Sequence, residues 1–89
     1  MPSKASKLLE RMRQKKTGWK RHDLERLYKR FGFVITDGGS HDKVTHPEFP
    51  ELITSLPRHD RIHEYMVIQA IRLVDRLEKL RREREQSDE

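Results

Sequence analysis

The N-terminal stretch from Ser3 to Lys16 carries apolar residues at the spacing i, i+3, i+4 and i+7, which predicts an amphipathic helix. The apolar positions are Ala5, Leu8, Leu9 and Met12. Thr17-Gly18 ends the stretch, and Trp19 follows. A tryptophan beside a helix end in so small a chain is expected to anchor that helix on the rest of the domain. A base-stacking role for Trp19 is the alternative, and it would need an exposed ring face.

A second helical face ends at Gly32 and is formed by Leu24, Leu27, Tyr28 and Phe31. Its first turn holds acidic residues and its last turn basic ones, an arrangement that complements the helix dipole. β-Branched and aromatic residues then predict a strand from Phe33 to Thr36, and Asp37-Gly38-Gly39 predicts a hairpin turn. Further strands are expected from Asp42 to His46 and from Leu52 to Leu56, where Pro57 stops the third.

The strongest helical pattern begins near Asp60, and its apolar positions include Val67, Ala70, Ile71, Val74 and Leu77. From Arg81 onward almost every residue is charged, so the helix is expected to fray there into a solvated tail. The order helix, helix, three strands, helix predicts an α+β fold. An antiparallel meander would carry both main helices on one face.

Length and composition narrow the possible functions. A chain of 89 residues forms one small domain with a single modest core, so a deep enclosed pocket is not expected. Its 20 Lys and Arg exceed its 15 Asp and Glu, and this balance favours nucleic acid or an acidic protein as partner. The absence of cysteine excludes disulfides and thiolate metal sites. No signal peptide and no membrane-spanning segment is recognisable, so we expect a cytoplasmic protein that does not enter a membrane.

A histidine placed directly after a flexible turn is the main candidate for chemistry. The stretch from Gly38 to His46 reads Gly-Gly-Ser-His-Asp-Lys-Val-Thr-His. The two glycines permit positive φ and close approach of a ligand, and the histidine beside them exchanges protons near neutral pH. If Val44 faces the helices, strand alternation puts His46 on the same side and places His41 and Lys43 on the open face of the sheet.

On that face, the neutral imidazole of His41 could take a proton from an RNA 2′-hydroxyl, which would then attack the adjacent phosphorus. The imidazolium or a second group could protonate the leaving 5′ oxygen, and this route needs no metal. Lys43 and Arg58 could offset the charge that develops on the phosphate oxygens. The alternative is a surface histidine that merely ends a hairpin.

The other histidines carry weaker expectations. His59 is interpreted either as a phosphate or partner contact or as an ordinary residue of a helix start, and His22 and His63 are expected to be solvated. His59 and His63 lie four residues apart, a spacing that can hold a metal. No carboxylate or thiolate pattern completes such a site, so no metal and no cofactor is predicted.

Basic side chains cluster before the second helix, at its end and around the start of the final helix. They are Lys15, Lys16, Lys20, Arg21, Lys29, Arg30, Arg58 and Arg61. A phosphate backbone could follow this surface, because RNA of A-form geometry is recognised largely through shape, phosphates and 2′-hydroxyls. The alternative is a set of exposed helix faces kept soluble by mixed charge.

The Gly39-Ser40-His41 motif resembles that of the HicA family of small toxins, when read with Tyr28 to Phe33 (Tyr-Lys-Arg-Phe-Gly-Phe) and with His46-Pro47. The similarity covers roughly Leu24 to Val74. It implies a double-stranded-RNA-binding-like α-β-β-β-α fold, here with an additional N-terminal helix. It also implies an mRNA-cleaving endoribonuclease in which His41 is catalytic, and a HicB-like antitoxin as protein partner.

This resemblance suggests a division of the chain and a set of RNA contacts. Residues 1–19 would form an accessory helix and its anchor, 20–80 the HicA-like domain and 81–89 a charged tail. The predicted RNA-binding residues are Gly39, Ser40, Lys43, Arg58, His59, Lys20 and Arg21. A non-catalytic RNA- or protein-binding module of the same fold is the alternative function.

One position and one stretch of the chain depart from the family pattern. Val44 stands three residues after the motif histidine, where these toxins often carry an aromatic residue. The stretch Arg61 to Met66 replaces a lysine-glycine-threonine sequence that commonly precedes the final helix. Both changes concern the substrate-facing part of the domain and RNA specificity more than the fold.

Overall fold

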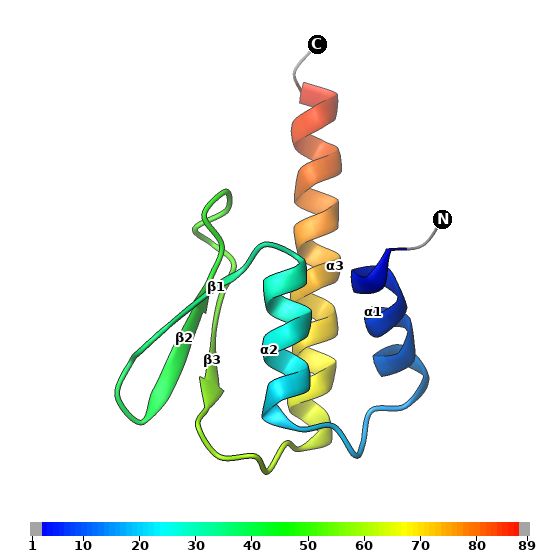
Figure 1. Ribbon diagram of the computed structural model, residues 1–89. Helices are drawn as coiled ribbons and strands as arrows, with labels where there is room; N and C mark the ends of the chain where they lie inside the picture. Colours follow the sequence, from blue (N-terminus) through cyan, green and yellow to red (C-terminus); the bar gives the residue numbers. More distant parts are fainter. Residues whose placement is uncertain (1–2, 88–89) are drawn as a thin grey trace.

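A computed structural model describes residues 3–87 of the chain as helices and one three-stranded sheet (Figure 1). The elements in chain order are α1 (Lys4–Gln14), α2 (Arg21–Arg30), β1 (Val34–Thr36), β2 (His41–Thr45), β3 (Ile53–Pro57) and α3 (Glu64–Ser87). This is the order that the apolar pattern predicts. The α+β class is therefore confirmed, and the α-β-β-β-α arrangement after α1 is consistent with the double-stranded-RNA-binding-like fold.

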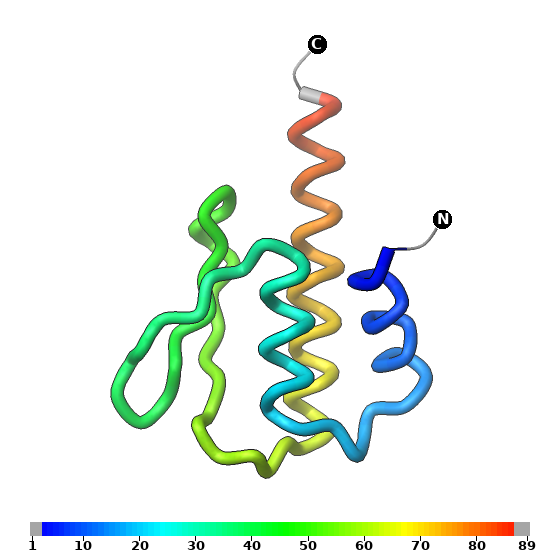
Figure 2. Tube along the Cα trace, in the orientation of Figure 1, coloured from blue at the N-terminus to red at the C-terminus, as the bar shows by residue number. Residues whose placement is uncertain are grey.

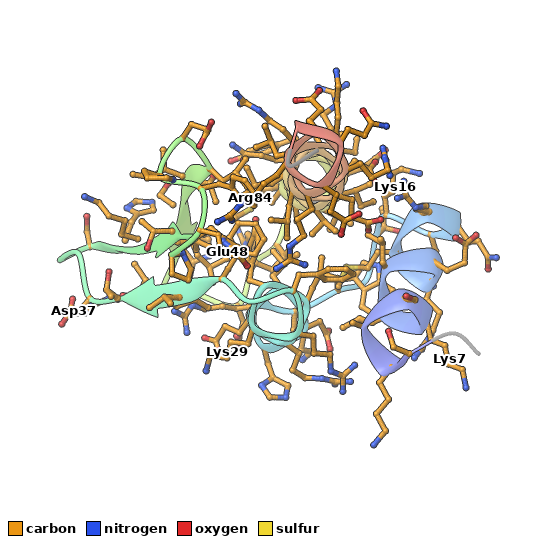
Figure 3. The ribbon with its side chains drawn as sticks, turned by 90° about the horizontal axis from the view of Figure 1, so that it is seen from above. Lys7, Lys16, Lys29, Asp37, Glu48 and Arg84 are labelled. Carbon is orange, nitrogen blue, oxygen red and sulfur yellow. The ribbon has the colours of Figure 1, made fainter. Side chains whose placement is uncertain are left out.

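The sheet is an antiparallel meander with β2 in its centre. Val44 of β2 pairs with Ile35 of β1 and with Thr54 of β3, and its side chain is fully buried. Helices α2 and α3 cover one face of the sheet, and α1 packs on the far side of these two helices (Figures 1 and 3). Within residues 3–87, no helix therefore covers the other face of the sheet.

Helix α1 joins the common core through its predicted apolar face. Its buried residues are Leu8, Leu9 and Met12. Ser3 caps the helix, since its Oγ accepts the Ser6 N–H at 3.1 Å. Arg13 ties the helix to α3, because its Nη1 donates to Asp75 Oδ2 at 3.0 Å, and this hydrogen bond raises the pKa of Arg13. The accessory helix is thus fixed to the domain by both packing and charge.

Trp19 acts as the predicted anchor after α1. Its partly buried ring packs against the core, and its Nε1 donates to the Lys15 carbonyl at 2.6 Å. The guanidinium of Arg11 lies over the ring, 5.5 Å from its centroid. The base-stacking alternative would have to displace this cation.

The bounds of several elements differ from the predictions. Helix α1 and strand β1 are shorter than predicted, and β1 begins at Val34 rather than at Phe33. β2 begins and ends one residue earlier than predicted, at His41 and Thr45, and β3 is shifted one residue later and includes Pro57. Pro57 is tolerated because β3 is an edge strand and the proline is its last residue. Helix α3 begins at Glu64, four residues after the expected start at Asp60, and the 58–63 segment connects it to β3 (Figure 2).

The predicted fraying from Arg81 is wrong, because α3 continues to Ser87. The loop between β2 and β3 supplies the reason. Glu48 of this loop accepts hydrogen bonds from Arg81 at 3.0 Å and from Arg84 at 3.2 Å, and Figure 3 shows Glu48 and Arg84 side by side. The guanidinium of Arg84 also lies 5.8 Å from the ring centroid of the buried Phe49. The last two residues of the predicted tail, 88–89, lie outside the described residues.

Candidate active site

His41 is the first residue of β2 and lies on the open face of the sheet. It pairs with Pro57 of β3, and its side chain is exposed. Lys43 is also exposed, whereas Val44 faces the helices and is buried, so the alternation predicted for this strand is confirmed. The imidazole is therefore accessible to a large ligand.

The two glycines before His41 serve different purposes. Gly39 has a φ of +89°, a conformation that favours glycine, and its N–H donates to Asp37 Oδ1 at 3.0 Å. Gly38 has no such φ, but a Cβ on it would lie 2.6 Å from the His41 carbonyl oxygen. Only Gly39 thus has the positive φ expected of both glycines. Gly38 leaves room for the backbone of the histidine itself.

Ser40 contacts the ring of His41. Its Oγ lies 3.3 Å from His41 Nδ1, so this side of the imidazole is beside a hydroxyl. Such a contact favours one ring orientation and leaves the other ring nitrogen, Nε2, available to a ligand. Ser40 is therefore placed to orient the histidine.

An open cleft of about 200 Å³ lies beside His41. Its lining residues are His41, Ser55, Pro57, His59, His63, Tyr65, Met66 and Gln69. They come from β2, from β3, from the 58–63 segment and from the first turns of α3. The start of α3 lies at the same end of the molecule as the turn between β1 and β2 (Figure 1). The fold thus brings three imidazoles, those of His41, His59 and His63, to one cleft.

His63, expected to be merely solvated, is held in the wall of this cleft while remaining exposed. Its ring stacks on that of Tyr65, with centroids 5.8 Å apart and an interplanar angle of 11°. The backbone N–H of His63 donates to Met66 Sδ at 3.4 Å, and the backbone carbonyl of His63 accepts the Met66 N–H at 3.0 Å. The only sequence signal for this site was the spacing of four between His59 and His63.

Behind the open face, Arg21 and Arg58 are joined by a shared carboxylate. Asp42, with 15% of its side chain exposed, pairs with Arg21 and accepts from Arg58 Nε at 3.2 Å. Arg21 also pairs with Glu25 and donates from Nε to the Pro57 carbonyl at 2.9 Å. These contacts connect α2, β2 and β3 directly behind His41.

Arg58 reaches from this network to the hairpin turn. Its Nη2 pairs with Asp37, the same carboxylate that accepts the Gly39 N–H. Both predicted arginines are therefore already paired with carboxylates, and Arg21 is the more enclosed, with 19% of its side chain exposed against 47% for Arg58. The pattern of the sequence did not reveal Asp42 as their common partner.

The side chains of the remaining predicted RNA contacts take no part in the ion pairs of this network. Lys43 is exposed on the open face and makes no ion pair within residues 3–87. His59 lies in the wall of the cleft. Lys20 is exposed at the start of α2, where its N–H donates to Asp23 Oδ2 at 2.9 Å. The free cation nearest to His41 in sequence is therefore Lys43.

Neither metal ligands nor a membrane span stand out in the structure. Within the part of the chain that the structure describes, no group of three or more His, Asp or Glu side chains is arranged to hold a metal ion. In the same residues, no helix is both long and apolar enough to cross a membrane.

Comparison with known families gives a match. Residues 21–75, more than half of the chain, match the model of the HicA toxin of bacterial toxin-antitoxin systems. This span holds α2, the sheet, the cleft and the first half of α3, and leaves α1 outside. A search of curated proteins and a search of solved structures found no match. The fold, the glycine-serine-histidine motif and this match agree, and the chain belongs to the HicA toxin family.

Proposed function

We propose that this protein is a metal-independent endoribonuclease that cleaves mRNA with His41 as its catalytic base. The observation that carries the proposal is the position of this histidine. It is exposed on the open face of the sheet, follows the glycine turn and lines a cleft with two further imidazoles. Membership in a toxin family supports the same conclusion.

In the proposed reaction, the neutral ring of His41 takes the proton of a 2′-hydroxyl as that oxygen attacks the adjacent phosphorus. The P–O5′ bond breaks, its electron pair stays on the 5′ oxygen, and that oxygen receives a proton. The products are a 2′,3′-cyclic phosphate and a 5′-hydroxyl. Exposed Lys43, two residues along the same strand face, would stabilise charge on the phosphate oxygens.

Arg21 and Arg58 receive a modified role in this proposal. Because Arg21 is enclosed by two carboxylates and a carbonyl, it acts by fixing β2 and β3 behind the histidine. Arg58 holds the hairpin turn through Asp37 and would reach a phosphate only by exchanging that carboxylate for it. Gly39, Ser40, His59 and Lys20 remain proposed contacts of the RNA.

A HicB-like antitoxin would neutralise the toxin by covering the cleft, since nothing within residues 3–87 closes over His41. Its carboxylates would face Lys43 and the basic surface near Arg58. Hydrogen exchange is then expected to slow between Gly38 and Val44 in the complex. Protection confined to α1, with cleavage persisting in the complex, would contradict this mode of inhibition.

Substitution of the histidine tests the proposed activity. His41→Ala should lower RNA cleavage by about 10²- to 10⁴-fold, the usual contribution of a general acid or base. His22→Ala is the matched control, because His22 is an exposed histidine of α2 outside the cleft. Equal cleavage by His41→Ala and the control would contradict the assignment. RNA binding without cleavage by the wild type would support the non-catalytic module instead.

A further inference from the structure

The base proposed above leaves half of the reaction without a named group. Breaking the P–O5′ bond places negative charge on an alkoxide, which is a poor leaving group unless it receives a proton. His41 removes a proton in the same step, so a second group that carries a proton must lie on the other side of the phosphate. Apart from His41, the side chains of the cleft that belong to ionisable residue types are His59, His63 and Tyr65.

We infer that His63 is this second group, the general acid that protonates the 5′ oxygen. The inference rests on the proposed ribonuclease activity. Its basis is that His63 and His41 line the same cleft from different elements, one just before α3 and the other at the start of β2. Groups that line one cleft from different elements can act on different sides of one phosphate.

The fixed orientation of its ring distinguishes His63 from His59. The imidazole of His63 stacks on Tyr65, and its backbone is held by two contacts with Met66. Met66 is buried, so this short segment is attached to the core. His59 is exposed in the 58–63 segment, and no hydrogen bond or ring contact fixes its side chain within residues 3–87. A general acid is more effective when its ring is already held near the reacting atom, and this favours His63.

Tyr65 has a different place in the arrangement. Its residue surface is 65% exposed, and its ring stacks on that of His63. Its phenol is a much weaker acid than an imidazolium. Tyr65 is therefore a positioning residue that holds the His63 ring in the cleft wall.

The proton balance of the step is complete with these two histidines. His63 enters as imidazolium and gives its proton to the 5′ oxygen as the P–O5′ bond breaks, while His41 receives the 2′-hydroxyl proton. After the step His63 is neutral and His41 is charged. Exchange with water restores both rings, and no metal or other co-reactant is consumed.

A leaving group that needs no proton separates the two roles. The substrate is an RNA oligonucleotide in which the linkage cut by the wild type carries sulfur in place of the bridging 5′ oxygen, because a thiolate leaves without protonation. His63→Gln should lower cleavage of the natural linkage by about 10²- to 10⁴-fold. It should cleave the sulfur-containing linkage within about threefold of the wild type. His41→Gln should be slow on both substrates, because attack by the 2′-hydroxyl still needs a base.

Matched variants keep the inference falsifiable. His22→Gln should change cleavage by less than about tenfold. His59→Gln, at a proposed RNA contact, should lower cleavage of both linkages alike, and Tyr65→Leu should give a partial loss that sulfur partly restores. Each variant is first checked for an unchanged unfolding temperature, and cleavage is compared at RNA concentrations that saturate each variant.

Several outcomes would overturn the inference and identify the reason. Normal cleavage by His63→Gln would exclude His63 as the acid, and a loss that sulfur does not restore would assign it a structural role. If the sulfur-containing linkage restored cleavage by His59→Gln but not by His63→Gln, the general acid would be His59. If the wild type itself cleaves neither substrate, the proposed ribonuclease activity fails, and this inference fails with it.

Discussion

His41 and His46 lie near the two ends of the same central strand but have opposite surroundings. His41 is exposed on the open face, where its one described ring contact is Ser40. His46 follows β2 on the helix-covered side, is 3% exposed, and uses both ring nitrogens: Nε2 donates to the Phe31 carbonyl at 3.2 Å, and Nδ1 accepts the Glu48 N–H at 3.1 Å. The same residue type thus serves structure on one face and is available for chemistry on the other.

The largest expected effect on stability is at His46. His46→Ala removes a ring that packs edge-on against Phe33, 4.8 Å between centroids, and leaves the two backbone partners of the imidazole unpaired. We expect the free energy of unfolding to fall by about 3 kcal/mol, from the lost packing of a buried aromatic ring and from two lost hydrogen bonds that contribute about 0.5–1.5 kcal/mol each. Urea unfolding measures this change. His41→Ala is the control and should change stability by less than about 0.5 kcal/mol. Equal losses in both variants would remove the contrast between the two histidines.

Asp42, adjacent to His41 but on the other face of β2, should have the next largest effect. Asp42→Asn weakens its contacts with Arg21 and Arg58, so we expect a loss of about 2 kcal/mol from hydrogen bonds to charged groups. Asp60→Asn is the control, because Asp60 is exposed and makes no ion pair within residues 3–87. Equal unfolding midpoints for the two variants would show that the network behind the histidine is not stabilising.

The two tyrosines extend the comparison of buried and exposed positions to pH. Burial raises the pKa of Tyr28 above its ordinary value of 10.0, whereas Tyr65 is largely exposed. The folded state holds the Tyr28 proton more tightly than the unfolded state does. The contribution of the protonated Tyr28 to the free energy of unfolding is therefore intact below pH 10 and is lost as the pH rises further. At pH 11 the loss is on the order of 1 kcal/mol. Tyr28→Phe should remove this part of the alkaline destabilisation, and Tyr65→Phe should leave it unchanged.

The smallest expected effect concerns the cations near the open face. Binding is measured with His41→Ala protein, so that RNA stays intact. Lys43→Gln should reduce the slope of log affinity against log salt by about 0.7, the value for one phosphate of a single strand. Arg58→Gln should change the slope less and the stability more, because Arg58 is paired with Asp37 and Asp42. The reverse ranking would move the phosphate contact to Arg58.

Local patterns predicted the fold and the position of His41 well. Helical spacing identified α1, α2 and α3, and the alternation around Val44 placed His41 on the open face. These features depend on neighbouring residues. The continuation of α3 to Ser87 depends instead on Glu48, which is far away in sequence.

The residues of the site were harder to predict, because their surroundings also depend on contacts between residues far apart in sequence. Counting basic residues suggested that Arg21 faces RNA, but its partner Asp42 lies on another element and encloses it. The path of the 58–63 segment brings His63 to the cleft, and only the folded chain shows that path. Contacts between residues far apart in sequence therefore determine which side chains line the cleft and which are enclosed in ion pairs. The spacing of residues along the sequence does not show these contacts.

The ends of the cleaved RNA test the central claim most directly. Purified wild-type protein is incubated with RNA with and without EDTA, and the product termini are identified by mass spectrometry. Cleavage by two histidines predicts 2′,3′-cyclic phosphate and 5′-hydroxyl ends, formed at the same rate in both samples. Products with 5′-phosphate and 3′-hydroxyl ends, or cleavage that stops in EDTA and returns with a divalent cation, would contradict the account.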